Sequence, residues 1–402
     1  MAPLSTPAEA EALVRARVGV LPVESRPIAS LAGAVLAQSV RAERDQPPFD
    51  RVTMDGIAFA SEAWRTGQRR FRMAGTLAAG QRPIALPAPD ACLEVMTGAM
   101  LPPGCDCVVP VELIDTADGW AEVEPEARVE PFANVHVRGL DCREGDLLLA
   151  RGTRLGGPEL AVLASAGLPR ADVHAEPRIM VVSTGDELVE PGEPIEDWQI
   201  RSSNAHALRG ALALRGFLRV AEDRLPDDPQ VLRDRLATHL ATHDALVLTG
   251  GVSMGMFDHV PSALRALGVT EVFHKVLQRP GKPLWFGIAP GGQAVYGLPG
   301  NPVSSLVCLV RYVVPGLQAA IGARTVPVES MPLGAPLRAH PSLWLFMPAQ
   351  LESSPLLGMV AMPKPTHGSG DLVSLLGSEG FLELPPGPAE IAAGQVVPFR
   401  RW

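Results

Sequence analysis

Strand-like and helical patterns alternate over the middle of this chain, and this alternation restricts the fold more than any other feature. Apolar runs typical of buried strands begin at Arg178 and at Ala245, and helical patterns follow at 203–214 and 228–242. Strands that alternate with helices of about 10 to 15 residues are typical of a doubly wound parallel sheet. The sequence therefore predicts an α/β domain in this part of the chain.

Three glycine-containing turns follow strands of this predicted sheet, at residues 183–187, 249–258 and 297–302. In open α/β sheets, ligands bind beyond the carboxyl ends of the strands. We therefore expect the three turns to lie at one edge of the sheet and to form a ligand site. Asn301 is expected to cap the helix that begins at Pro302.

The turn TGGVSMGMFD, at residues 249–258, carries the clearest chemistry. Gly250 and Gly251 allow positive φ and let a ligand approach the backbone. The N–H groups of such a turn, with the start of the next helix, favour anions. Asp258 adds a carboxylate, which a Mg²⁺ ion between protein and phosphate requires. The turn predicts a Mg²⁺-dependent site for a phosphorylated small molecule, although the glycine motif alone fits an ordinary strand–turn–helix corner better.

The cations of this chain are distributed unevenly. Lys and Arg total 35, yet lysine occurs only at Lys275, Lys282 and Lys364. A compact ammonium on a flexible stem is not interchangeable with a guanidinium. Two lysines within eight residues therefore suggest catalysis or phosphate contact at Lys275 and Lys282, with chance codon usage as the alternative. The net charge of −9 argues against a nucleic-acid or membrane surface, since both need broad positive fields.

The remaining composition indicates a globular protein of the cytoplasm. No apolar run reaches the ~18 residues of a membrane span, and the N-terminal stretch lacks the pattern of a signal peptide. The five cysteines form no C-x-x-C pair and are expected to be free thiols in a reducing compartment. Cys105 and Cys107 could grip a soft metal, but a strand that buries small residues is the preferred interpretation.

The flanking segments are richer in short β patterns. Residues 61–140 predict a small β domain, and residues 324–402 a C-terminal β-barrel or sandwich. His367–Gly370 is interpreted as a surface turn rather than a ligand loop. His239 and His243 have i, i+4 spacing, but without an intervening glutamate motif we expect them to face solvent and not to bind a metal.

Seven motifs in register resemble one family. They are PPFDRVTMDGIAFA, VMTGAMLPPGCDCVVPVE, VVSTGDEL, TGGVSMGMFD, KVLQRPGKP, GLPGNPVS and HGSGDLVSLLGSEGF, and they occur in this order. Together they resemble the molybdopterin molybdenumtransferases, that is, the MoeA family and the E domain of gephyrin. The resemblance runs from about residue 5 to residue 400.

The resemblance implies four domains. Residues 1–44 and 141–175 would form a discontinuous, elongated linker domain, 45–140 an inserted β domain, 176–323 the molybdopterin-binding α/β domain, and 324–402 a C-terminal β domain. It also implies a homodimer whose active cleft combines one subunit's α/β domain with the other subunit's β insert. Members of the family insert molybdate into adenylated molybdopterin, release AMP and require Mg²⁺. Candidate protein partners are the molybdopterin adenylyltransferase and molybdoenzyme chaperones.

Site residues follow from the motifs and the resemblance together. The expected catalytic residues are Asp55, Asp141, Glu187, Lys275 and Arg279. The expected substrate contacts are Thr97, Ser183, Thr184, Gly185, Thr249, Gly250, Gly251, Ser253, Lys282, Pro299 and Asn301. The expected Mg²⁺ ligands are Glu187, Asp258, and Asp227 or Asp228. Pyrophosphate cleavage needs charge stabilisation more than covalent chemistry, which suits such a set.

Some residues depart from the family pattern. Arg279 replaces a lysine, Ile57 replaces a tyrosine, and the stretch 345–348 lacks a common arginine. A tungstate-inserting paralogue is the first alternative, because the two oxyanions are nearly identical in size and charge. A molybdopterin adenylyltransferase, a CinA-like hydrolase and a scaffold protein are disfavoured, since the first two would not need the MDG and MTGA motifs and a scaffold would need a long linker.

Overall fold

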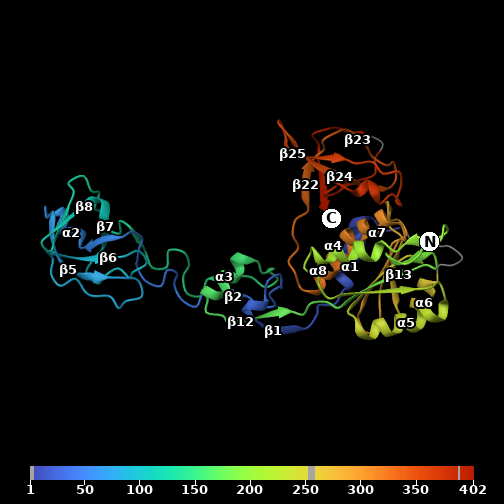
Figure 1. Cartoon of the computed structure of the whole chain (residues 1–402), viewed down its shortest axis with the longest axis horizontal. Coiled ribbons are helices and arrows are strands. Elements are labelled where there is room, and N and C mark those ends of the chain that lie inside the picture. The colour runs from blue at the N-terminus through green and yellow to red at the C-terminus, as the bar shows by residue number, and fades with distance from the viewer. Residues whose placement is uncertain (1–3, 252–258, 388–389) are drawn as a thin grey trace. The chain divides into compact units, whose positions relative to one another are not determined.

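The computed structural model describes residues 4–251, 259–387 and 390–402. The chain divides into two compact units (Figure 1). The first comprises residues 1–38, 152–156 and 170–402, and the second comprises residues 39–151 and 157–169. Each unit has its own sheet and core, and each is described by itself below.

A six-stranded mixed sheet forms the centre of the first unit. Its order is β16-β13-β17-β21-β20-β18. The bounds are β13 Ile179–Thr184, β16 Val220–Leu225, β17 Ala245–Thr249, β18 Thr270–His274, β20 Trp285–Ile288 and β21 Ala294–Leu298. β16, β13, β17 and β21 are parallel, as the alternation predicts, but β20 runs antiparallel to both of its neighbours. The prediction of a wholly parallel sheet was wrong there, because the connection 289–293 is too short for a crossover and makes a hairpin.

Helices cover both faces of this sheet (Figure 1). On one face pack α1 (Pro7–Arg17), α4 (Asn204–Ala213), α7 (Pro302–Cys308) and α8 (Val314–Ala320), and on the other α5 (Pro229–Thr242) and α6 (Val260–Ala266). A π-helical turn, Leu309–Val313, joins α7 to α8. The run 302–320 is long and apolar enough to cross a membrane, but 83% of its apolar 18-residue window is buried in the protein, so core packing accounts for its composition.

The C-terminal segment of the first unit adds a second sheet. Its strands are β22 (Glu329–Pro332), β24 (Trp344–Ser354), β25 (Gly358–Pro363), β26 (Gly380–Leu384) and β28 (Val396–Arg401), and β23 (Leu337–Arg338) pairs with β27 (Glu390–Ile391) beside it. The short strand β19 (Gln278–Arg279) leaves the α/β layer and pairs in parallel with β24. This short segment between β18 and β20 is therefore a strand of the second sheet.

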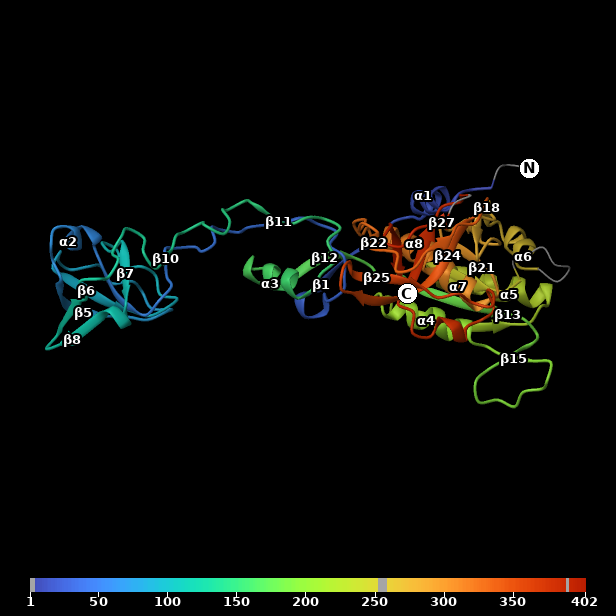
Figure 2. The same ribbon diagram turned by 90° about the horizontal axis from the view of Figure 1, so that it is seen from above.

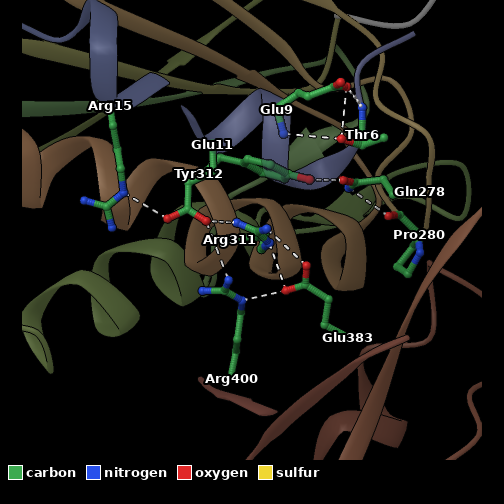
Figure 3. A network of polar contacts seen from close by, with 10 residues as sticks. All are labelled: Thr6, Glu9, Glu11, Arg15, Gln278, Pro280, Arg311, Tyr312, Glu383 and Arg400. Carbon is green, nitrogen blue, oxygen red and sulfur yellow. Dashed lines mark hydrogen bonds and ion pairs between the residues drawn. The ribbon is translucent and has the colours of Figure 1, made fainter. Parts of the chain in front are cut away.

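A buried ionic cluster also joins the layers of the first unit (Figure 3). Arg311, 3% exposed in the π-helical turn, pairs with Glu11 of α1 and with Glu383 of β26. Arg400 of β28 lies 2.8 Å from Glu383 and 3.6 Å from Glu11. Arg15 reaches Glu11 from the outer side at 2.9 Å. This cluster links the N-terminal helix, the α/β layer and the C-terminal sheet.

The second unit contains a six-stranded sheet of order β7-β4-β6-β5-β9-β8, with α2 beside it (Figure 2). The bounds are β4 Gly56–Phe59, α2 Ser61–Arg65, β5 Arg70–Leu77, β6 Ala91–Val95, β7 Cys107–Pro110, β8 Ile114–Ala117 and β9 Trp120–Val123. The paired strands β2 (Val40–Arg41) and β11 (Leu147–Leu149), and β3 (Arg51–Val52) and β10 (Val135–His136), complete this unit with α3 (Gly157–Ser165). In the first unit, β1 (Val23–Pro27) pairs with β12 (Arg170–His174).

The cysteines are free thiols, as the sequence predicts. Burial raises the pKa of Cys92, Cys105 and Cys107 to about 12, so these thiols stay protonated. Cys107 lies in β7 and is fully buried, as the preferred interpretation has it, whereas Cys105 is buried just before that strand.

Candidate functional site

A cavity of about 1410 Å³ lies in the first unit at the carboxyl edge of its central sheet. The turns that follow β13, β17 and β21 line it on one side, and loops of the C-terminal segment line it on the other. Twelve predicted site residues contribute to its wall: Ser183, Thr184, Gly185, Glu187, Asp227, Thr249, Gly250, Gly251, Arg279, Lys282, Pro299 and Asn301. The structure thus brings together the three turns that the sequence places at one edge.

The glycines of the second turn are required by close backbone packing. Gly250 has φ +94°, and a Cβ there would lie 2.6 Å from the Thr184 carbonyl oxygen. Gly251 has φ +63°, and its Cβ would lie 2.9 Å from the Thr184 hydroxyl. Contacts below 3 Å and positive φ both exclude larger residues. The turn after β17 is therefore seated directly on the turn after β13.

Hydroxyl groups at the strand ends differ in what they contact. Thr249 Oγ1 accepts a hydrogen bond from Asn204 Nδ2 at 2.9 Å and also contacts Ser305 Oγ at 3.1 Å, so it ties helices α4 and α7 to β17. The hydroxyls of Ser183 and Thr184 are buried and have no hydrogen-bond partner among residues 4–251, 259–387 and 390–402. A buried polar group without a partner is costly, so these two are suited to receive a ligand.

Asn204 is a cavity residue that the sequence did not single out. Its amide donates to Thr249 Oγ1 and, at 2.7 Å, to the Gly300 carbonyl. It therefore holds the second and third turns together. The signal available in the sequence is its place at the start of the predicted helix after Ser202-Ser203, where polar residues ordinarily cap the helix itself.

Two of the three predicted cationic site residues line the cavity, and the third does not. Arg279 and Lys282 are exposed at the cavity, and neither side chain makes a hydrogen bond or ion pair within the part of the chain that the structure describes. Lys275 does not line the cavity. It has φ +74°, unusual for a residue other than glycine, and its N–H donates to the Leu284 carbonyl. Two of the three predicted cations thus face the space where an anion would bind.

The predicted acidic residues of the first unit also differ in whether they line the cavity. Glu187 and Asp227 line the cavity, and the Asp227 N–H donates to Asp186 Oδ1 at 3.2 Å. Asp228 instead caps α5, accepting from the N–H groups of Gln230 and Val231 at 2.9 and 2.8 Å. Ser253 and Asp258 lie outside the described residues, so their predicted roles stay predictions.

The loop His367–Gly370 lines the cavity, so its interpretation as a mere surface turn was incomplete. Asn301 Nδ2 donates to Ser369 Oγ at 2.7 Å, and the N–H of Val303 donates to the Ser369 carbonyl. Asn301 stands at the N-cap of α7, as predicted, but its side chain makes no capping bond. Instead, it connects the α/β layer to the C-terminal loop across the cavity wall.

Three predicted site residues lie in the second unit, on two hydrogen-bonded pairs. Asp55 Oδ1 accepts from both the N–H and the hydroxyl of Thr97, each at 2.7 Å. Asp141 Oδ1 lies 2.9 Å from Nε2 of His136, whose Nδ1 contacts Arg51 at 3.1 Å. The MDG and MTGA motifs therefore meet, and His136 is a neighbour of Asp141 that the sequence did not indicate.

Thr97 controls the protonation of Asp55. Its N–H and then its hydroxyl hold the pKa of the Asp55 carboxyl below the ordinary value of 3.8. We expect Thr97→Val, which removes the hydroxyl but keeps the N–H, to raise this pKa part of the way towards 3.8. Because the folded pKa is depressed, the contribution to stability is present above pH 3.8 and is lost as pH falls through the folded value. An NMR titration of the Asp55 carboxyl would measure the change, and an unchanged pKa would contradict the assignment.

The histidine pair on α5 differs from its prediction. His239 is buried and its Nε2 lies 2.6 Å from Asp223, so the expectation that it faces solvent was wrong. Its neighbour His243 is half-buried, and burial lowers its pKa. An acid on the adjacent strand β16 accounts for the buried imidazole, which the spacing of the two histidines alone could not reveal. Within the described ranges no group of three or more His, Cys, Asp or Glu side chains could hold a metal.

Comparison with known proteins covers nearly the whole chain. The MoeA N-terminal region (domain I and II) matches residues 5–167, the probable molybdopterin binding domain matches 180–319, and the MoeA C-terminal region (domain IV) matches 330–402. The molybdopterin molybdenumtransferase of Synechocystis sp. is 40% identical over 92% of this chain and 93% of its own, and that of Synechococcus elongatus is 35% identical over 96% and 97%.

A solved structure agrees with these matches. The crystal structure of a molybdopterin biosynthesis MoeA protein from Pyrococcus horikosii superposes with a TM-score of 0.81 at 28% identity, covering 99% of each chain. The resemblance seen in the seven motifs is thereby confirmed. The chain belongs to the MoeA family of molybdopterin molybdenumtransferases.

Proposed function

We propose that this chain catalyses Mg²⁺-dependent insertion of molybdate into adenylated molybdopterin, with release of AMP. The observation that carries the proposal is the cavity at the carboxyl edge, where exposed Arg279 and Lys282 share one space with Glu187 and Asp227. The relatives named above are molybdopterin molybdenumtransferases, and the family model over residues 180–319 describes a probable molybdopterin binding domain. A molecule that carries phosphates and a metal suits a cavity with both signs of charge.

Anions would bind to the cationic side of this cavity. The protein has a net charge of −9, so two molecules as anionic as molybdate and an adenylated pterin need local positive charge. Arg279 and Lys282 supply it, and the hydroxyls of Ser183 and Thr184 supply donors that the described structure leaves without partners. Charges and dipoles that are already in place stabilise the extra negative charge that develops as a phosphate bond breaks.

Mg²⁺ would bind to the acidic side. Glu187 and Asp227 are the carboxylates that line the cavity among the described residues. Asp258, in the turn at 249–258, stays a proposed Mg²⁺ ligand. Mg²⁺ is commonly held by one or two carboxylates together with substrate phosphates, so this donor set fits the ion without a protein cage of three or more ligands. When bound, the ion would neutralise phosphate charge. Asp228 is the weaker candidate because it caps α5.

Asp55, Thr97 and Asp141 enter this proposal through a homodimer. They lie in the second unit, whereas the cavity lies entirely in the first. A shared cleft, in which the second unit of one subunit serves the cavity of the other, would bring Asp55 and Asp141 to the reacting phosphates. The four predicted domains, a cytoplasmic location, and encounters with an adenylyltransferase and with molybdoenzyme chaperones are parts of the same proposal.

Turnover by the purified chain tests the proposal. Adenylated molybdopterin, Mg²⁺ and molybdate are mixed with the protein, and AMP is measured over time. We expect AMP release that depends on the oxyanion and falls about 10²-fold or more in Asp55→Ala, by the usual effect of removing a charged catalytic group. Substituting tungstate for molybdate separates the two oxyanion specificities. No AMP release with either oxyanion and any divalent metal would refute the activity, and a monomer in sedimentation would refute the shared cleft.

A further inference from the structure

Arg279 and Lys282 lie on one turn of the cavity wall. Two buried hydrogen bonds, which involve Gln278, Pro280 and Tyr312, support the backbone of this turn (Figure 3). Gln278, 1% exposed, donates through Nε2 to the Pro280 carbonyl at 3.0 Å. The Tyr312 hydroxyl donates to Gln278 Oε1. Both ends of the Gln278 amide are therefore used, and the carbonyl in the middle of the turn is connected to the helical segment 309–313.

Gln278 and Tyr312 are both deeply buried, and within the described structure Gln278 Nε2 has one further hydrogen-bond acceptor, Cys308 Sγ. Tyr312 is fully buried, and burial raises its pKa well above the ordinary value, so its hydroxyl stays protonated and donates. Cys308 Sγ lies 3.5 Å from Gln278 Nε2. A Cβ on Gly281, which has φ +90°, would lie 2.5 Å from the same nitrogen. The backbone of the turn is thus packed directly against the amide.

The other side of the turn is fixed by the C-terminal sheet. Gln278 pairs with Trp344 and Arg279 with Leu345 where β19 meets β24. The turn is therefore held both by the backbone of β24 and by the hydrogen-bonded pair Gln278–Tyr312. Long side chains such as those of Arg279 and Lys282 reach a ligand only as well as their backbone is placed, and a displacement of about 1 Å can cost as much as 10²-fold in rate.

We propose that Gln278 and Tyr312 are positioning residues, which hold the Arg279–Lys282 turn at the distance from which its cations bind the oxyanion. This inference rests on the proposed use of the cavity as the substrate site. Gln278 also lines the cavity, but it is only 1% exposed, and the inference assigns to neither residue a contact with substrate. Their effect reaches the ligand through the Pro280 carbonyl and the backbone of the turn.

The chain provides a matched control, because it contains only two tyrosines. Tyr296 is also fully buried, but its hydroxyl has no hydrogen-bond partner among the described residues and packs against Gly316. It does not line the cavity. Tyr312→Phe and Tyr296→Phe therefore remove the same atom from the same kind of environment, and only the first removal reaches the turn.

The experiment compares Tyr312→Phe, Gln278→Met, their double variant and Tyr296→Phe in the full-length chain. The KM for molybdate, kcat, the melting temperature, and calorimetric binding of molybdate or inorganic phosphate are measured. We expect the first two variants to raise the KM and the dissociation constant about tenfold, the effect of one lost charged contact. We expect Tyr296→Phe to change neither. The double variant should melt at a higher temperature than Gln278→Met, since it leaves no tyrosine hydroxyl without a partner, while its KM stays raised because the Pro280 carbonyl still lacks a donor.

Two results would overturn the inference. One is a KM in Tyr312→Phe equal to that in Tyr296→Phe, and the other is a KM that recovers together with the melting temperature in the double variant, which would make the role merely structural. Oxyanion binding that depends on Tyr312 but is accompanied by no AMP release would support the inference and refute the proposed activity. A wild-type chain that binds neither molybdate nor phosphate would overturn both.

Discussion

Lys282→Met should lower the rate of oxyanion-dependent AMP release by about 10²- to 10³-fold, the effect of removing one preorganised group that stabilises developing charge. Lys282 is exposed at the cavity, and its ammonium makes no hydrogen bond or ion pair in the described structure. The charge is therefore available to a ligand and contributes little to the fold. The melting temperature of the variant should stay close to that of the wild type, which separates a lost contact from a lost structure.

Lys364→Met is the matched control for this substitution. Lys364 does not line the cavity, and its ammonium donates to the Leu376 carbonyl within the C-terminal segment. Lys282→Arg adds a second comparison, because a guanidinium keeps the charge but replaces a compact donor with a planar one. We expect a rate between those of Lys282→Met and the wild type. A rate in Lys282→Met equal to that in Lys364→Met would remove Lys282 from the site.

The strand ends of the central sheet could be predicted from the sequence because each element there is local. A buried apolar run followed by glycine is readable within one short window, and so is the Asp228-Pro229 start of α5. Since the strands concerned are parallel, the position of their turns at one edge follows from topology alone. The cavity wall made by β13, β17 and β21 was therefore accessible to prediction.

The other wall was not accessible, because it depends on pairing between distant segments. β19 has two residues and no hydrophobic pattern, yet its pairing with β24 places the cationic turn against the C-terminal sheet. The loop His367–Gly370 reaches the cavity through Asn301 and Ser369, which are separated by 68 residues. The reversal of β20 did have a local signal, since Pro290, Gly291 and Gly292 are typical of a tight turn.

The role of Arg311 depends on its contacts in the folded protein and could not be predicted from the sequence pattern around it. In the sequence, Arg311 interrupts the apolar stretch 303–314, and the only conclusion it allows there is that this stretch is a poor membrane span. In the structure it is 3% exposed and pairs with Glu11 and Glu383, which come from opposite ends of the chain. No spacing rule connects these three positions, so only the folded arrangement shows that the charge is balanced.

Arg311→Met should lower the free energy of unfolding of the first unit by about 3 kcal/mol, because Glu11 and Glu383 lose their most buried partner and keep only Arg400 as a shared one. Arg15→Met is the control, since Arg15 contacts the same Glu11 from a more exposed position, and we expect it to cost less than about 1 kcal/mol. Denaturant unfolding followed by circular dichroism would measure both. Similar losses in the two variants would contradict the importance assigned to burial.

The dependence of this loss on pH provides a second test. Burial alone would raise the pKa of Glu11, but Arg311, with Arg15 and Arg400, outweighs it and holds the pKa below its ordinary value of 4.5. In the wild type this contribution is present above pH 4.5 and is lost as pH falls through the lowered value. In Arg311→Met the effect of Arg311 is lost while that of burial remains, so the pKa of Glu11 should rise and the variant should lose less stability than the wild type as pH falls through 4.5. The difference between the two proteins should therefore shrink in acid, and a difference that stays constant between pH 7 and pH 4 would show that lost packing, not unpaired charge, causes the instability.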